Sequence, residues 1–161
     1  MIEINLVAGA WDEDAARTEL ARALEALRVA LGLPDETSVS VLLCDDAYIA
    51  GLNAEFRGKD RATNVLSWPS ETRPVPSDVY AFDPLVIRDP EIGDLAFAYE
   101  TVLAEAEAAL LDWRDHFLHL SLHGMLHLLG FDHEDEAEAA VMEGLEIKTL
   151  ETLGKHNPYI D

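Results

Sequence analysis

Residues 123–133 have the sequence HGMLHLLGFDH, which places three histidines at spacings of four and then six. In an α-helix, residues four apart lie on the same face, so His123 and His127 can offer two imidazoles to one ion. Six further residues of helix would carry His133 away from that face. Gly130 resolves this, because glycine readily takes the left-handed conformation that ends a helix and lets the chain turn back. The segment therefore predicts a metal site on a helix.

Three neutral imidazoles leave the fourth tetrahedral position for water, which is the arrangement of catalytic rather than structural zinc sites. A bound ion can lower the pKa of that water to about 7 and supply hydroxide. We therefore expect one zinc ion (Zn²⁺) per chain and a hydrolytic reaction. Two alternatives stay open: the histidines pack within an apolar helix, or the ligand pair is shifted to His119 and His123. Met142 is expected either as an apolar floor beneath the metal or as a helix-core residue.

The hydrophobic pattern around this segment alternates between helix and strand periods. Helices are predicted over residues 114–129 and 136–153, after a strand over 93–100 and a helical stretch that begins at 101. Towards the N-terminus the pattern predicts strands over residues 2–7, 37–44 and 64–68 and helices over 12–31 and 46–56. The order βαβαββααα is typical of an α+β (mixed αβ) fold, a four-stranded mixed sheet packed with helices. We expect residues 1–161 to form one domain.

Turn residues mark the boundaries of these elements. Residues 32–34, GLP, should end the first long helix, Asp45 or Asp46 should cap the next one, and Gly58 should close it. Five of the seven prolines lie within residues 69–90, so this segment is expected to be an irregular loop of about twenty residues. A loop of that length is either a functional lid or a floppy insertion.

The charge balance limits the partners. Eleven Lys and Arg against 32 Asp and Glu give a net charge of −21, which argues against indiscriminate nucleic-acid binding. Arg57, Lys59 and Arg61 nevertheless cluster in the segment RGKDR, which is either a local basic rim or a solvated turn. The single cysteine, Cys44, lies in an apolar run and should be buried, so a disulfide within the chain is excluded. Without a signal segment or a run approaching about 18 apolar residues, we expect a cytoplasmic protein.

The histidine pattern resembles the HExxHxxGxxH signature of metzincin proteases, but residue 124 is Gly where those enzymes carry the glutamate general base. It is more similar to the HGxLHLxGxDH signature of the YbeY family, single-strand-specific endoribonucleases of bacterial ribosomal RNA maturation. LNAEFR at 52–57 resembles that family's LNxxxR, ATNVLSWP at 62–69 its TDVLSFP, and IGDLAFAYE at 92–100 its LGDI strand. Asn64 stands where the family usually has Asp, and the proline-rich loop is longer than the family norm.

The resemblance implies a zincin-like metal helix, with His123, His127 and His133 as zinc ligands and Arg57 as a functionally important arginine. It also implies action on the 3′ end of 16S ribosomal RNA and in ribosome quality control, with RNA and the small ribosomal subunit as partners. The lack of a long apolar run separately predicts no membrane partner. A chemical argument also supports Arg57. Phosphodiester cleavage builds negative charge on the phosphoryl oxygens, and a guanidinium can stabilise that charge by donating paired hydrogen bonds. Asp132, next to His133, is a candidate general base, an orienting group for a ligand, or a plain turn residue.

Two rival functions stay open. One is a metalloprotease-like hydrolase, against which Gly124 speaks because it offers no carboxylate. The other is a ribosome-assembly factor that binds without cutting, in which zinc holds the C-terminal helices together. The discriminating observation is whether metal-loaded protein leaves single-stranded RNA intact while it associates with the small subunit.

Overall fold

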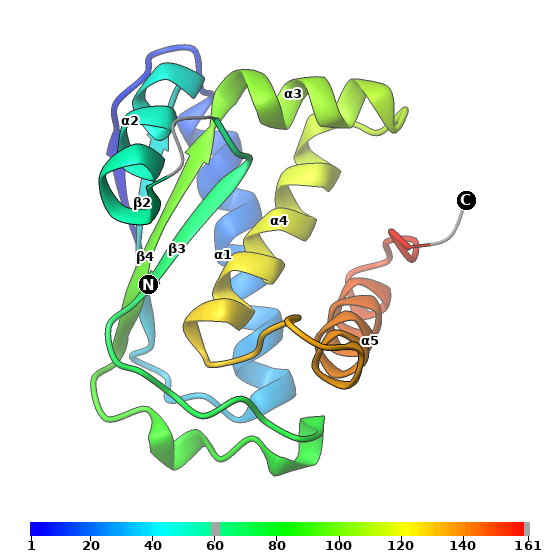
Figure 1. Cartoon of the computed structure of the whole chain (residues 1–161). Helices are drawn as coiled ribbons and strands as arrows, with labels where there is room; N and C mark the ends of the chain where they lie inside the picture. The colour runs from blue at the N-terminus through cyan, green and yellow to red at the C-terminus, as the bar shows by residue number, and fades with distance from the viewer. Residues whose placement is uncertain (59–61, 160–161) are drawn as a thin grey trace.

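The computed structural model describes residues 1–58 and 62–159 (Figure 1). Over these residues the strands are β1 (Ile2–Leu6), β2 (Ser38–Cys44), β3 (Val65–Pro69) and β4 (Glu91–Ala98). The helices are α1 (Glu13–Leu31), α2 (Asp46–Arg57), α3 (Tyr99–Ala108), α4 (Trp113–Leu128) and α5 (Glu136–Thr152). This order is the predicted one. The main difference from the predicted bounds is at β4, which begins and ends two residues earlier than predicted, so that α3 begins at Tyr99.

The strands of residues 1–58 and 62–159 form one mixed four-stranded sheet in the order β1-β2-β4-β3. β1 pairs with β2, and β2 with β4, in parallel, whereas β3 pairs with β4 antiparallel. The α+β class expected from the sequence is therefore confirmed. The strand order places β3 at the sheet edge, where Val65 lies opposite Phe97 and Trp68 opposite Asp94.

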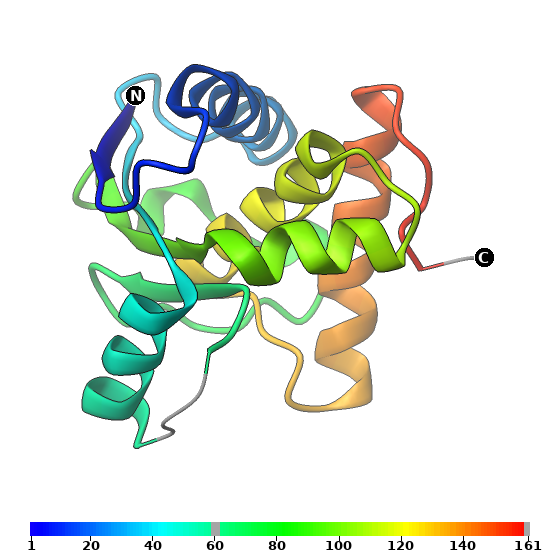
Figure 2. The ribbon, with the colours of Figure 1, turned by 90° about the horizontal axis from the view of Figure 1, so that it is seen from above.

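The two faces of the sheet are covered unequally because side chains alternate along each strand. Residues of β2 and β4 that point to one side, such as Val41 and Phe97, join the main core under α1 and α4. Residues that point to the other side, such as Cys44 and Ala96, form a smaller cluster with Ile49 of α2. Figures 1 and 2 agree on the layers: α2 lies on one side of the sheet, α1 and α4 on the other, and α5 beyond them.

Local capping explains where the helices begin and end. The side chains of Asp12, Asp45 and Asp135 each accept a hydrogen bond from a backbone N–H in the first turn of α1, α2 and α5. Of the two candidates for capping α2, the structure selects Asp45. Gly32 and Gly58 end α1 and α2 in the left-handed conformation, as the sequence predicts.

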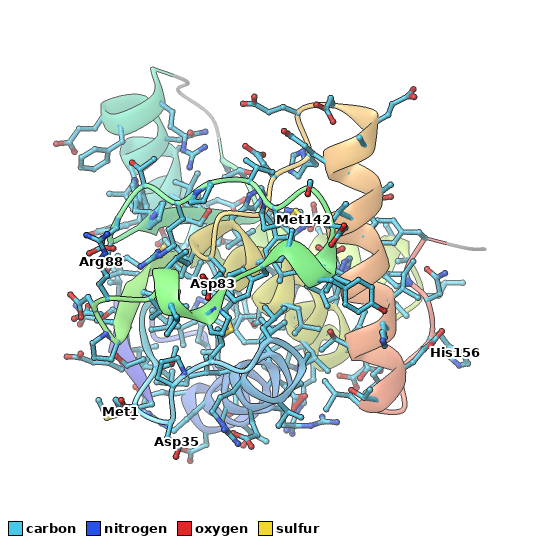
Figure 3. The ribbon with its side chains drawn as sticks, turned by 90° about the horizontal axis from the view of Figure 1, so that it is seen from below. Met1, Asp35, Asp83, Arg88, Met142 and His156 are labelled. Atoms are coloured by element: carbon cyan, nitrogen blue, oxygen red, sulfur yellow. The ribbon has the colours of Figure 1, made fainter. Side chains whose placement is uncertain are left out.

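The proline-rich loop packs on the body of the protein. After β3 it contains two short 3-10 helices, Val79–Ala81 and Pro84–Val86, and Phe82 stacks on Phe131 with ring centroids 5.7 Å apart. Figure 3 shows these turns lying across one end of the molecule, with Asp83 labelled. Over the described residues, none of the helices is both long and apolar enough to cross a membrane.

Candidate metal centre

Helix α4 carries the histidine motif and lies very close to the sheet. A Cβ at Gly124 would stand 2.9 Å from Leu95 Cδ2 on β4, which is closer than real Cβ atoms come. Glycine at this position therefore lets the helix approach the strand. The same geometry explains the departure from the metzincin pattern, because a glutamate at position 124 would point into the sheet.

The helix ends where the motif requires a turn. Gly130 has a φ of 107°, its N–H donates to the carbonyl of His127, and the N–H of Phe131 donates to Leu126. A Cβ at Gly130 would also meet the carbonyl oxygen of Pro74 at 2.6 Å. The left-handed turn predicted at Gly130 is therefore present, and the proline-rich loop packs directly against it. His133 lies three residues after Gly130, and the turn brings it close to His123 and His127.

The three histidines converge on one point. Ring nitrogens of His123, His127 and His133 lie within 4.8 Å of one another. The Nε2 atoms of His123 and His127 are 3.1 Å apart, and their ring planes are nearly perpendicular, at 83°. An ion held tetrahedrally at 2.0–2.1 Å would separate its ligand nitrogens by roughly 3.4 Å. The spacing of the histidines therefore fits a small divalent ion.

The outer nitrogens of two of these rings are held by acceptors. His123 Nδ1 lies 2.6 Å from Glu146 Oε1, and His127 Nδ1 lies 3.0 Å from the carbonyl oxygen of Phe131. Because both acceptors favour a proton on Nδ1, both Nε2 lone pairs point inward, as metal ligands require. Burial, followed by the neighbouring imidazoles, lowers the pKa of His127 to about 4. His127 is therefore neutral at pH 7.

Glu146 contacts the candidate metal ligand His123 and was not predicted from the sequence. It is 0% exposed on α5, and its carboxylate faces His119, His123 and the hydroxyl of Tyr159. Burial alone would raise the pKa of this carboxyl group, but the hydrogen bonds from those partners outweigh it and lower the pKa to about 2. One signal could have found it: Glu146 lies four residues after Met142 and four before Leu150, on the apolar face of its helix.

The other histidines of α4 face carboxylates. His119 Nε2 lies 3.3 Å from Glu146, and His116 Nε2 lies 2.9 Å from Glu105. In the described part of the chain, the group of three histidines is His123, His127 and His133, so the shifted pair is not what the geometry favours. Met142 is 1% exposed in the main core and does not line the cleft, which agrees with its helix-core alternative.

The three histidines line a cleft of about 580 Å³. Arg57, at the end of α2, lines the same cleft; its side chain is exposed, and Nη2 donates to the carbonyl oxygen of Ser67 at 3.1 Å. The structure thus brings Arg57 and the histidines to one cavity although they are far apart in sequence. Lys59 and Arg61, the rest of the predicted basic rim, lie outside the described residues.

Asp132 and Arg73 also line the cleft. Asp132 Oδ1 accepts a hydrogen bond from the backbone N–H of His133 and lies 3.9 Å from His127 Nδ1, beyond hydrogen-bond distance. For His127, the acceptor at Nδ1 is therefore the Phe131 carbonyl and not Asp132. Arg73, also missed from the sequence, is buried and donates to the carbonyl oxygen of Leu128 at 2.7 Å, where α4 ends.

Comparisons with known proteins agree on one family. The family model described as Endoribonuclease YbeY matches residues 3–154. The chain belongs to the YbeY family. Proteins named Endoribonuclease YbeY are 48% identical in Dinoroseobacter shibae, covering 98% of this chain and 90% of the relative, and 42% identical in Paracoccus denitrificans, covering 99% and 90%. The relative in Jannaschia sp. is 51% identical over 78% of each chain.

A solved structure has a similar fold. The solution structure of TM1509 from Thermotoga maritima superposes with a TM-score of 0.57 and 23% identity, and each chain is covered completely.

Asn64 stands where the YbeY motif usually has aspartate, and its contacts in this structure give a local reason. Asn64 Nδ2 donates to Glu105 at 3.0 Å, so an aspartate here would place two carboxylates face to face.

Proposed function

We propose that this YbeY-family protein is a zinc-dependent, single-strand-specific endoribonuclease that acts in 16S rRNA 3′-end maturation and ribosome quality control. The observation that carries the proposal is that three convergent imidazoles and Arg57 line one open cleft. Family membership supports the reaction class, because the relatives are named endoribonucleases. We propose that the protein is located in the cytoplasm, where its ribosomal RNA substrate is found.

The proposed chemistry divides between the ion and the chain. When bound, zinc supplies Lewis-acid chemistry, which can polarise a phosphodiester oxygen and lower the pKa of a water molecule. His123, His127 and His133 would hold it through nitrogens that are already turned inward. Arg57 would bind the phosphoryl oxygens as charge develops on them, because its planar guanidinium can donate two parallel hydrogen bonds.

Asp132 is the proposed general base. It is a partly exposed carboxylate in the same cleft, and its Oδ1 is held by the backbone N–H of His133. That contact leaves Oδ2 to accept a proton from the attacking hydroxyl or water. The assignment follows from position in the cleft, because catalysis requires a base within hydrogen-bond reach of the proton it abstracts.

The net charge of −21 shapes how RNA would be bound. A strongly negative protein repels polyanions at long range, so recognition should be confined to the cleft and assisted by a partner. We infer that the partner is the small ribosomal subunit, which would hold the RNA end near the site. Free single-stranded RNA should then bind weakly.

The rivals make different demands on the site. A protease of the metzincin kind needs a carboxylate beside the first ligand, and Gly124 faces Leu95 with no room for one. Arg57 in the histidine cleft supports cleavage, because a guanidinium in the same cavity as the metal ligands can stabilise charge that develops on a phosphate. An arginine on a phosphate would also serve binding alone, so the cleavage test separates these two functions.

The test is cleavage of a labelled single-stranded RNA with the sequence of a 16S precursor 3′ end, with its duplex form as control. We expect metal-loaded protein to cut the single strand, a chelator to stop the reaction, and added zinc to restore it. Product ends should then be examined, because a 2′,3′-cyclic phosphate would identify the substrate's own 2′-hydroxyl as nucleophile. Intact RNA, together with binding to small subunits, would instead establish the non-cleaving factor.

A further inference from the structure

A buried carboxylate connects the candidate metal centre to the C-terminal part of the chain. Glu146 Oε1 lies 2.6 Å from Nδ1 of His123. Its Oε2 lies 3.3 Å from Nε2 of His119 and accepts a hydrogen bond from the hydroxyl of Tyr159. The carboxylate comes from α5, the two imidazoles from α4, and the hydroxyl from the segment that follows α5. The segment after α5 also reaches α4 here, because the ring of Tyr159 packs edge-on against that of His119, with ring centroids 5.6 Å apart.

Packing alone does not explain this glutamate. It is 0% exposed, and the neighbouring positions on the same face of α5 are Met142, Leu145 and Leu150. A leucine at position 146 would continue that apolar face without the large cost of removing a carboxylate from water. Hydrogen-bond partners stabilise this charge, and one of them, His123, is a candidate metal ligand.

We propose that Glu146 is a positioning residue of the metal centre and that Tyr159 orders it, so that the C-terminal segment is part of the centre. The inference rests on the proposed function for the metal itself. Glu146 keeps the proton of His123 on Nδ1, so that Nε2 presents its lone pair to the ion, and the negative charge makes the imidazole a stronger ligand. Tyr159 and His119 engage Oε2, which leaves Oε1 for His123.

The two ligands that have an acceptor at Nδ1 are supported differently. His127 is held by a neutral acceptor, the carbonyl oxygen of Phe131, which lies on the turn just beyond α4. His123 is held by a full negative charge from another helix. Loss of the carboxylate should therefore affect His123 selectively and leave the orientation of His127 unchanged.

The experiment measures the zinc dissociation constant of the full chain by competition with a chelator at fixed pH. Glu146→Gln keeps the shape of the side chain and removes the charge, and we expect affinity to fall by about 10- to 100-fold. Tyr159→Phe removes only the hydroxyl, and we expect a smaller loss of several-fold. Glu151→Gln, on the exposed surface of the same helix, is the matched control and should bind zinc like wild type.

A second readout follows the histidines without metal. Nitrogen-15 spectra of the imidazoles should show the proton of His123 on Nδ1 in wild type and a mixture of tautomers in Glu146→Gln, with His127 unchanged. A folded Glu146→Gln protein with wild-type zinc affinity would overturn the inference. If that variant does not fold, Tyr159→Phe decides: unchanged affinity and an unchanged His123 tautomer would overturn it equally. Wild-type protein that binds no zinc would instead refute the proposed function.

Discussion

Replacement of Arg57 by alanine separates the chemistry of the cleft from its architecture. Arg57 is exposed and, among the described residues, donates a hydrogen bond of 3.1 Å to the carbonyl oxygen of Ser67. Its removal should therefore change the free energy of unfolding by no more than about 1 kcal/mol. Arginine stays protonated and offers only donors, so the bound metal should be retained. The loss should appear in catalysis.

The expected catalytic loss follows from what Arg57 would do to a phosphate. Removing one donor that stabilises developing oxyanion charge costs about 2–4 kcal/mol, which is roughly 30- to 1,000-fold in rate. Arg57→Lys should recover only part of it, because an ammonium keeps the charge without the planar two-pronged geometry. The assay is single-turnover cleavage of a single-stranded RNA, with metal content and thermal unfolding measured on the same samples.

Arg17 provides a matched control. It is another exposed arginine that donates one hydrogen bond to a backbone carbonyl, that of Ile2 at 3.0 Å, but it lies on α1 and does not line the cleft. Arg17→Ala should cleave at the wild-type rate. If Arg57→Ala also cleaves at that rate with its metal retained, the phosphate-stabilising role is wrong, although the histidine site would stand.

Further predictions concern stability and reactivity. Gly124→Ala should lower the unfolding free energy by about 1–3 kcal/mol through its contact with the sheet, whereas Gly144→Ala, a helical glycine with open space around it, should raise it by up to about 1 kcal/mol. Thermal unfolding compares the two, and a Gly124→Ala protein as stable as wild type would contradict the close packing. Arg73→Met should lower stability to chemical denaturation by about 1–3 kcal/mol, because the carbonyl oxygen of Leu128 loses its buried donor; no change would refute this role. Burial, aided by nearby carboxylates, raises the pKa of Cys44 to about 12, so the native thiol should resist a disulfide reagent at pH 8 and react at once when unfolded. Rapid reaction of the native protein would show that Cys44 is accessible.

Much of the architecture was predictable because it depends on local signals. The period of the apolar residues predicted the α-helices and strands described above, although not the two 3-10 helices of the proline-rich loop, and Asp45, Gly32 and Gly58 fix boundaries through contacts within a few residues. The turn at Gly130 was predictable for the same reason. The strand order β1-β2-β4-β3 was not, because pairing joins segments far apart in the chain and leaves no local pattern.

The site was predictable where its members lie in a recognisable motif, the histidines in HGMLHLLGFDH and Arg57 in LNAEFR. His123, His127 and His133 lie within eleven residues, so one turn of helix and the turn at Gly130 bring them near one another. Glu146 and Arg73 reach the site through tertiary packing. A glutamate within a helix is ordinarily solvated, and a loop without periodicity gives no indication of which side chain turns inward.

The measurement that tests the central claim most directly is the metal content of the purified chain. Protein prepared without chelator should contain one zinc ion per chain by elemental analysis, because three inward-facing imidazoles suit tetrahedral zinc. His127→Ala, prepared in the same way and shown to be folded, should contain almost none. A wild-type stoichiometry near zero, or an unchanged stoichiometry in folded His127→Ala, would contradict the assignment of His123, His127 and His133 as a metal centre.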